Sequence, residues 1–262
     1  MTDEFPNVVV LSAGGYGHVP IPLVKQTEDI RRQSTNNNTT TTIIIPIQNR
    51  TYFTSYVGSL THAPNQMRQR LHQRLMDVDK TMTASSSSSP SNMMLTSISS
   101  HMTTSISQAT NTNSTATATK ASELHFYKYY YGNSWRDTMD NTKYSLCPRG
   151  FGRTSYHVME TLQMGYIPIQ IYSDIPWLPY HELFKEKDIG YSISTNEASF
   201  YLRTLLSKTT NEELQRKEDL IRELRDSHFT IDGIMNQISK FMLGDPSSDL
   251  RCVPLPSSVR DG

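Results

Sequence analysis

The spacing of apolar residues predicts short strands and one helix in the first third of the chain. We expect buried strands at Asn7–Leu11 and Ile43–Ile47, and a polar loop of low complexity at Ser34–Thr42. Arg50–Val57 alternates apolar and polar positions as a strand does. A helix should follow over Asn65–Asp79, because its apolar residues recur at helical spacing on one face.

The later part of the chain alternates regularly between strand and helix. The pattern predicts strands at Leu124–Tyr131, Tyr144–Cys147, Ile167–Ile171 and Ile189–Ile193, helices at Ser134–Asn141 and Ser155–Met164, and further helices beginning at Ser194, Thr210 and Ile231. Ser194 and Thr210 are each followed three residues later by glutamate, which is a capping-box pattern. This alternation predicts an α/β fold in which helices layer a mainly parallel sheet.

The tract Thr81–Lys120 differs from its surroundings. Serine, threonine and asparagine dominate it, so it cannot bury enough apolar surface to offset the entropy lost on ordering. We interpret 81–120 as a disordered insertion, because the segments on both sides continue one alternating pattern. The predicted organisation is a remnant of a preceding domain or a linker at 1–42, one domain at 43–245 and a flexible tail at 246–262.

Charge and cysteine content exclude several classes of protein. The chain has 25 basic and 25 acidic side chains, so it lacks the basic face that general nucleic-acid binding needs. Its two cysteines, Cys147 and Cys252, cannot build a disulfide scaffold and match no zinc motif. No apolar run approaches the roughly 20 residues of a transmembrane helix. The residues after Met1 are acidic and polar, so we expect no signal peptide there.

The most informative segment, Cys147–Ser155, reads Cys-Pro-Arg-Gly-Phe-Gly-Arg-Thr-Ser and joins a predicted strand to a predicted helix. Open α/β sheets bind ligands outside such strand ends. The unpaired N–H groups and the macrodipole at the start of a helix favour an anion. Gly150 and Gly152 let the backbone approach a ligand closely. Arg149 and Arg153 can hold phosphate oxygens bidentately, which predicts a phosphate site.

Each part of this segment also has an ordinary structural interpretation. A glycine turn before a helix is commonly only a tight connection, and Ser155 can serve as a plain N-cap. Arg149 can pair with a surface carboxylate. The segment is not a P-loop, because no Gly-Lys-Ser/Thr follows a spacer of the required length.

Glu160 lies on the same predicted helix, about 7.5 Å along the axis from Ser155 at 1.5 Å per residue. That separation is similar to the one between the pyrophosphate and the ribose of a nucleotide. A carboxylate there can accept hydrogen bonds from both ribose hydroxyls. The alternative is a solvated helix glutamate.

Taken together, these segments resemble the signature of exostosin-type glycosyltransferases. The matching pieces are Cys147–Ser155, Glu160, Gly165, Ile167–Pro168, Ser173–Asp174 and Trp177–Tyr180. Upstream, Arg50–Gly58 followed by Met67-Arg68 resembles the earlier block of the family, in which a strand ends in glycine and an arginine opens the next helix. The resemblance spans Ile43–Phe200, with the serine- and threonine-rich tract as an insertion.

The resemblance implies a fold, an activity and a set of site residues. The family fold is the GT-B architecture of two Rossmann-like domains facing a cleft, so this chain would carry the carboxy-terminal, nucleotide-sugar-binding half. The implied reaction transfers a sugar from a nucleotide-diphosphate donor, usually a UDP-sugar, to a glycan or glycoprotein acceptor. The implied diphosphate-binding residues are Arg149, Gly150, Arg153, Ser155 and His157, the ribose-binding residue is Glu160, and the cleft-edge residues are Asp174, Leu178, Pro179 and Tyr180.

Charge explains how such a site would act. Cleavage of the sugar–phosphate bond leaves negative charge on the diphosphate, which preorganised hydrogen-bond donors stabilise. Because arginines and a helix terminus can do this alone, we expect an inverting transfer without a metal or a cofactor. An inverting transfer also needs a general base, which we expect outside this chain.

The chain departs from the family pattern in two respects. His157 stands where many members have arginine, so phosphate contact there is expected to depend on pH near neutrality. By comparison with the family pattern, we expect this chain to lack most of the amino-terminal domain that would supply much of the acceptor site, and therefore to bind donor but turn over little. The resemblance implies a Golgi location, with membrane attachment only through a segment outside this chain, and leaves the oligomeric state open.

Two other functions remain open at this point. One is a non-catalytic module, or a truncated inactive fragment, that binds a nucleotide or a phosphorylated sugar. The other is an α/β interaction protein in which the serine- and threonine-rich tract is the functional part.

Overall fold

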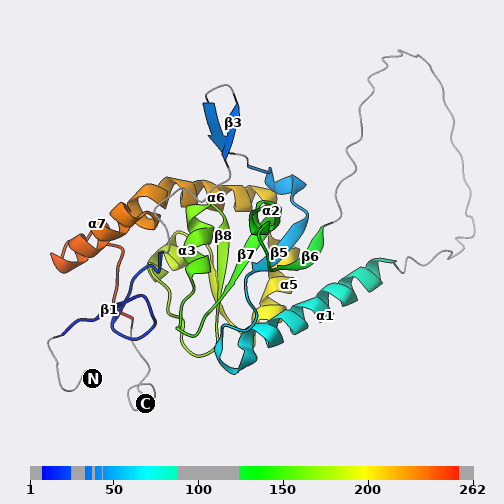
Figure 1. The fold of residues 1–262 in the computed structure, drawn as a ribbon, viewed down its shortest axis with the longest axis horizontal. Helices are drawn as coiled ribbons and strands as arrows, with labels where there is room; N and C mark the ends of the chain where they lie inside the picture. Colours follow the sequence, from blue (N-terminus) through cyan, green and yellow to red (C-terminus); the bar gives the residue numbers. More distant parts are fainter. Residues whose placement is uncertain (1–7, 25–32, 37–38, 43, 88–123, 254–262) are drawn as a thin grey trace, which may run out of the picture.

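A five-stranded, fully parallel sheet forms the centre of the molecule (Figure 1). The computed structural model describes residues 8–24, 33–36, 39–42, 44–87 and 124–253. The strands of the sheet are β5 (Tyr52–Val57), β6 (His125–Tyr130), β7 (Thr142–Pro148), β8 (Ile167–Tyr172) and β9 (Tyr191–Ser194). The predicted α/β class and the Rossmann-like parallel sheet are therefore confirmed.

The order of the strands across the sheet is β6-β5-β7-β8-β9. In chain order this is 2-1-3-4-5, a doubly wound arrangement in which the direction of winding reverses between the first and third strands. Those strands are β5 and β7, which pair directly with Thr54 opposite Tyr144. Ligands of such sheets bind at the carboxyl ends of these two strands, so the topology alone indicates where to look for a site.

Helices cover both faces of the sheet, as the parallel connections require. The helical elements are α1 (Met67–Ser87), α2 (Trp135–Asp140), α3 (Tyr156–Gln163), α4 (His181–Glu186), α5 (Ala198–Lys208), α6 (Asn211–Leu224), the π-helical turn η3 (Arg225–Phe229) and α7 (Ile231–Met242), with short 3-10 turns at η1 (Ile47–Asn49) and η2 (Pro64–Gln66). Helix α1 contacts α5, and α3 contacts α6 on the other side of the sheet (Figure 1).

The core lies where the central strands are covered on both faces. Leu146 of β7 and Ile167, Ile169 and Ile171 of β8 are completely buried. A strand buried on both faces reads as a nearly continuous apolar run, and β8 shows this pattern. The rigid central strands fix the position of the loop that follows β7.

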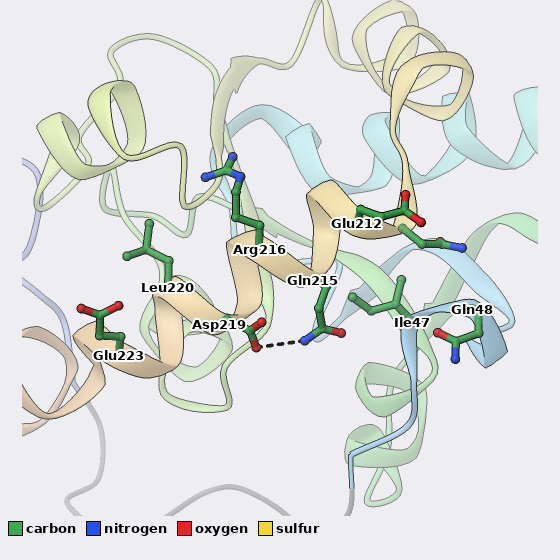
Figure 2. A pocket seen from close by; sticks show the side chains of 9 residues that line it. Ile47, Gln48, Glu212, Gln215, Arg216, Asp219, Leu220 and Glu223 are labelled. Atoms are coloured by element: carbon green, nitrogen blue, oxygen red, sulfur yellow. Dashed lines mark hydrogen bonds between the residues drawn. The ribbon is translucent and has the colours of Figure 1, made fainter.

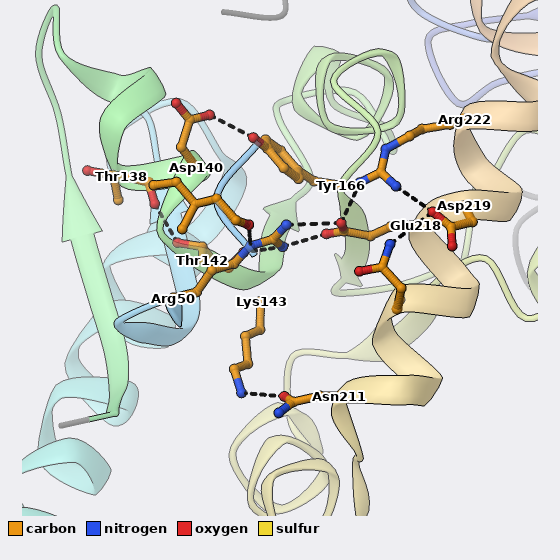
Figure 3. A network of polar contacts seen from close by, with 12 residues as sticks. Arg50, Thr138, Asp140, Thr142, Lys143, Tyr166, Asn211, Glu218, Asp219 and Arg222 are labelled. Carbon is orange, nitrogen blue, oxygen red and sulfur yellow. Dashed lines mark hydrogen bonds and ion pairs between the residues drawn. The ribbon is translucent and has the colours of Figure 1, made fainter. Parts of the chain in front are cut away.

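A buried ion pair closes the opposite end of the sheet (Figure 3). The guanidinium of Arg50 donates to both carboxylate oxygens of Glu218 on α6, at 2.5 and 2.9 Å. It also donates to the carbonyl of Thr142, at 3.1 Å, and lies over the ring of Tyr166. Arg50 therefore joins the start of β5 to β7 and α6, a structural role far from the strand ends where ligands bind.

Several strand predictions in the first part of the chain are wrong. Val8 and Val9 are about half exposed, and only Leu11–Ser12 forms a strand, β1, which pairs with β2 (Val19–Pro20). Ile47 begins η1 with Pro46 at its N-cap, so no strand forms there. The predicted polar loop instead contains β3 (Gln33–Asn36) and β4 (Thr39–Thr42), which pair antiparallel.

Helix boundaries also shifted in places. Helix α1 continues to Ser87, so residues 81–87 of the predicted insertion are helical, and 88–120 lie outside the described residues. Helix α5 begins at Ala198 with Glu197 at its N-cap, so the predicted start at Ser194 is wrong. The hydroxyl of Ser194 donates to the carboxylate of Glu197 and does not cap the helix. The predicted helix that begins at Ile231 is confirmed as α7, although Ile231 and Met235, two of its apolar residues, are exposed.

The two ends of the described chain pack on the sheet domain. Val19 of β2 and Leu250 of the carboxy-terminal segment are completely buried. The backbone N–H of Val253 donates to the carbonyl of His18 at 2.9 Å. Residues 246–253 therefore join the folded unit, and the rest of the predicted tail, 254–262, lies outside the described residues.

Candidate functional site

A cavity of about 550 Å³ lies at the carboxyl ends of β5 and β7. This is the point at which the winding of the sheet reverses, where doubly wound proteins bind their ligands. Its wall is formed by residues after β5, by the start of α1, by the loop after β7 and by the start of α3. The lining residues used below are Tyr56, Arg68, Gly150, Gly152, Ser155, Tyr156, His157 and Glu160.

The loop after β7 folds around the side chain of Arg149. The backbone N–H of Gly150 donates to the carbonyl of Thr154 at 3.0 Å, which closes the loop. Inside it, Arg149 donates through Nε to the carbonyl of Gly152 at 3.1 Å and through Nη2 to the carbonyl of Phe151 at 3.0 Å. Arg149 is buried, so its guanidinium acts as the internal support of the loop.

A single carboxylate holds both arginines of the loop. Nη1 of Arg149 donates to Asp174, and Nε of Arg153 donates to the other carboxylate oxygen at 2.9 Å. Partial burial alone would raise the pKa of Asp174, but hydrogen bonds from Arg153, the N–H of Ile175 and Arg149 outweigh it and lower that pKa. Arg149 therefore pairs with a carboxylate, which was the alternative to the predicted phosphate contact.

The amino-terminal segment covers the outer side of this loop. Nη1 of Arg153 donates to the carbonyl of Gly15 at 2.8 Å, and its guanidinium lies over the ring of Tyr16. A Cβ atom on Gly152 would lie 2.6 Å from the carbonyl oxygen of Gly14. The close approach that Gly152 permits is therefore to the protein's own chain.

The predicted site residues thus divide into three groups. The first group lines the cavity and consists of Gly150, Ser155, His157 and Glu160. The second group forms the ion-pair cluster behind the loop and does not line the cavity; it consists of Arg149, Arg153 and Asp174. The predicted cleft-edge residues Leu178, Pro179 and Tyr180 are buried in the core because they lead into α4, and they line no described cavity.

Helix α3 presents its amino end to the cavity. Ser155 is its N-cap, and the Oγ atom accepts a hydrogen bond from the N–H of His157 at 3.2 Å. The N–H groups of Ser155 and Tyr156 have no acceptor among the described residues. These unpaired amides and the helix macrodipole favour an anion at this point.

His157 and Glu160 lie together on the face of α3 that lines the cavity. Nδ1 of His157 is 3.4 Å from Oε2 of Glu160, and Nε2 is 3.0 Å from the hydroxyl of Ser145 on β7. These contacts fix the imidazole between the sheet and the glutamate. Glu160 is about one quarter exposed, so its carboxylate is accessible from the cavity.

Arg68 supplies the guanidinium that lines the cavity, and the sequence interpretation assigned it no role. It donates to three backbone carbonyls at 2.9–3.0 Å, those of Arg149, Ser59 and Pro148. Arginine has five N–H groups, so these bonds leave two for a ligand. Burial lowers the pKa of Arg68 from its ordinary value, but an arginine remains charged near neutral pH. The arginine that opens the helix in the family pattern was the signal for it.

A metal site is not evident in the part of the chain that the structure describes. No group of three or more histidine, cysteine, aspartate and glutamate side chains lies close enough to hold an ion there. The sequence does contain an Asp-x-Asp pair, Asp77 and Asp79 on α1, a pattern that can hold a metal ion. Asp79 accepts hydrogen bonds from the amides of Phe126 and Tyr127, and Asp77 accepts one from Gln73, so both carboxylates have partners within the fold.

A larger cavity, of about 780 Å³, lies beside η1 and α6 (Figure 2). Its wall combines Ile47 with polar side chains of α6, including Gln215, Arg216 and Asp219. It adjoins the amino end of β5, the end of the sheet at which open α/β proteins do not bind their ligands. The smaller cavity at the carboxyl ends of β5 and β7 is therefore the better candidate site.

The fold is that of a doubly wound α/β protein, with a cavity at its switch point whose wall includes a helix start and a guanidinium. Comparison of the sequence with profiles of known protein families and with curated proteins found no match to either. None of the described helices is both long and apolar enough to cross a bilayer. What the protein does must therefore be argued from the cavity itself.

Proposed function

We propose that this chain is the nucleotide-sugar-binding half of an exostosin-type glycosyltransferase, with the donor bound in the cavity at the ends of β5 and β7. A single observation carries the proposal. The start of α3, the guanidinium of Arg68 and the carboxylate of Glu160 line one cavity at the switch point of the sheet. This combination suits a phosphate group and a ribose at neighbouring positions.

The diphosphate is proposed to lie at the start of α3. There the amides of Ser155 and Tyr156, the hydroxyl of Ser155 and two N–H groups of Arg68 can donate to its oxygens. The helix terminus contributes roughly 0.3–1 kcal/mol near a surface, so Arg68 would supply most of the charge stabilisation. Arg149 and Arg153 would act indirectly, by holding the loop in the conformation that exposes these donors.

The ribose is proposed to lie against Glu160. Glu160 lies about 7.5 Å farther along α3 than Ser155, at 1.5 Å per residue. Its carboxylate can accept hydrogen bonds from both ribose hydroxyls. His157 would hold this carboxylate in place, because Nδ1 lies 3.4 Å from it. This arrangement favours a nucleotide over a free diphosphate.

The reaction proposed is transfer of the donor sugar to a glycan or glycoprotein acceptor, without a metal. Donors aimed at the leaving diphosphate lower the barrier because they stabilise charge that develops in the transition state. The general base and the Golgi location belong to this proposal through the family resemblance alone.

One observation favours the alternative of a non-catalytic nucleotide-binding module. Asp174 pairs with both Arg149 and Arg153, and neither arginine lines the cavity, so fewer cations face the diphosphate than the sequence indicated. A site with less positive charge stabilises a leaving diphosphate less, although it still binds a nucleotide.

Calorimetric titration with UDP tests the binding site. We expect Arg68→Ala to weaken UDP binding by about tenfold or more, the loss of roughly 1.4 kcal/mol or more. Arg216→Ala is the matched control, because this arginine is about half exposed on α6 and distant from the cavity. Thermal unfolding of each variant confirms that it is folded. An Arg68→Ala protein that is folded and binds UDP as tightly as the wild type would refute the donor site.

The assignment of Glu160 to the ribose is tested by comparing UDP with inorganic pyrophosphate as ligands. Glu160→Gln should weaken UDP binding by about fivefold and leave inorganic pyrophosphate binding unchanged. An equal loss for both ligands would contradict the assignment. Release of UDP from a panel of UDP-sugars, with and without saccharide acceptors, then separates a transferase from a binding module.

A further inference from the structure

A third cavity, of about 520 Å³, runs between α1 and β6, the strand at the edge of the sheet. Rings form most of its wall. We call it the aromatic groove and define it by Tyr52 on β5, by His125, Tyr127 and Tyr129 on β6, and by His72 on α1. Its size lies within the range of small-molecule sites, and none of the interactions argued above uses it.

The rings gather into two groups along the groove. At one end, the rings of Tyr52 and His125 lie 6.2 Å apart, centre to centre. At the other, His72 lies 4.7 Å from Tyr129 and 5.8 Å from Tyr127. His125 is exposed, and Tyr52, His72 and Tyr129 are half-buried, so ring surface remains accessible to a ligand.

Hydrogen bonds hold the second group of rings in place. The hydroxyl of Tyr127 lies 3.1 Å from Nδ1 of His72. Which of the two atoms donates depends on the tautomer of the imidazole. Burial raises the pKa of the Tyr127 phenol and lowers the pKa of His72, which favours the neutral form of both groups. Nε2 of His72 has no partner among the described residues, so it is available to form a hydrogen bond with a ligand.

The charged groups of the aromatic groove limit what can bind there. Asp79 accepts hydrogen bonds from the amides of Phe126 and Tyr127, so this part of the edge strand is not free to pair with a peptide. The ammonium of Lys128 lies over the ring of Tyr52. With one acid and one base at its wall, the groove carries no strong net charge, which suits a neutral, hydroxyl-rich ligand.

The aromatic groove adjoins the proposed donor cavity. The ring of Tyr129 lies 5.9 Å from the ring of Tyr56, which lines that cavity. Along α1, Arg68 and His72 are one helical turn apart and project from the same face. A chain-like ligand lying in the groove would thus have one end near the donor.

We propose that the aromatic groove binds a saccharide, as a subsite for the acceptor glycan; this rests on the function proposed above. Ring faces of aromatic side chains pack against the apolar C–H faces of a sugar ring. The phenol groups, Nε2 of His72 and the ammonium of Lys128 provide hydrogen-bond partners for its hydroxyls. Because these rings are already fixed, little conformational entropy is lost on binding.

Titration of the full chain with cellotetraose, xylotetraose and chitotetraose, which are neutral saccharides, tests the proposal, with binding followed by NMR. We expect at least one of these probes to bind. His125→Ala and Tyr52→Ala should each weaken that binding by about fivefold to tenfold. Tyr131→Ala is the matched control, because Tyr131 is an exposed tyrosine just beyond β6 that does not line the groove. It should change the affinity by less than about twofold.

The outcomes separate this inference from the donor site. Loss of saccharide binding in the groove variants, with UDP binding unchanged, supports the subsite. If none of the probes binds, or if His125→Ala and Tyr52→Ala bind as tightly as Tyr131→Ala, the subsite is refuted. If Arg68→Ala leaves UDP binding unchanged while the groove variants lose saccharide binding, the donor site fails and the saccharide site stands.

Discussion

Arg153 donates a hydrogen bond of 2.9 Å to Asp174, and this contact turns its guanidinium toward the amino-terminal segment instead of the cavity. Arg149 shares the same carboxylate. The two arginines of the glycine loop therefore act first on the loop, and Arg68 is the arginine that lines the cavity.

Asp174→Asn tests this division of roles. If Arg149 and Arg153 support the loop, removing the carboxylate charge loosens the loop, and UDP binding should weaken by about twofold to fivefold. Asp219→Asn is the control, because Asp219 also pairs with an arginine but lies on α6, away from the cavity. Tighter UDP binding by Asp174→Asn would instead show that Asp174 competes with the diphosphate for the arginines.

The same carboxylate makes a pH-dependent contribution to stability. The pKa of Asp174 is lower in the folded protein, so its contribution is fully present above the unfolded value near 3.9. It is lost as the pH falls through the folded value. Because Asp174 is 40% exposed, the contribution at pH 7 should be below about 1 kcal/mol. The stability difference between wild type and Asp174→Asn, measured by urea unfolding, should begin to shrink below about pH 4 and disappear once the pH falls below the lowered pKa of the folded protein. A difference that stays constant as the pH falls would contradict this origin.

Local patterns in the sequence predicted the elements whose stability is decided locally. Helix α6 is an example, because the hydroxyl of Thr210 accepts the N–H of Glu213 at 3.2 Å, as the capping pattern predicted. Local sequence patterns failed where the structure of a segment depends on the segment that pairs with it. Thr39–Thr42 becomes a strand only by pairing with Gln33–Asn36, and no local rule indicates which partner a polar run will find.

The same limit applies to the candidate site. The sequence placed Gly150, Ser155, His157 and Glu160 near a ligand, because a strand, a glycine loop and a helix start fix their positions. It could not show that Asp174 would take up both arginines of the loop, because that depends on how the turn after β8 folds back. The sequence marked Arg68 as the arginine that opens a helix, but it could not show that this helix would form a wall of the cavity.

Gly152→Ala should destabilise the protein, because its Cβ atom would lie 2.6 Å from the carbonyl oxygen of Gly14. We expect a loss of about 1–3 kcal/mol, the usual cost of a forced overlap. Gly14→Ala is the matched control from the same contact, because the nearest atom to its Cβ would be 3.9 Å away. Urea unfolding of both variants measures the difference. Equal stabilities would mean that the amino-terminal segment does not dock tightly on the loop.

The two thiols should differ sharply in reactivity. Burial raises the pKa of Cys147 to about 12, so it has almost no reactive thiolate in the folded protein. Cys252 is exposed. A disulfide reagent such as DTNB should label Cys252 rapidly and Cys147 only on unfolding, and native Cys252→Ser protein should remain unlabelled. Rapid labelling of that variant would show that β7 opens readily.

Arg50 and Glu218 should behave as one unit. Both side chains are almost completely buried, so removing one leaves the other without its main partner in a region of low dielectric. Arg50→Met should lower the free energy of unfolding by about 3 kcal/mol, near the lower end of the usual cost, because Arg222 still pairs with Glu218 at 2.7 Å. The double variant Arg50→Met/Glu218→Leu replaces the pair with apolar side chains, so its free energy of unfolding should lie only about 1–2 kcal/mol below that of the wild type.

Urea unfolding of both single variants and the double variant gives the coupling energy between Arg50 and Glu218 directly. Additive losses would mean that the pair is not coupled, and that the contacts of Arg50 with the carbonyl of Thr142 and the ring of Tyr166 carry its contribution instead.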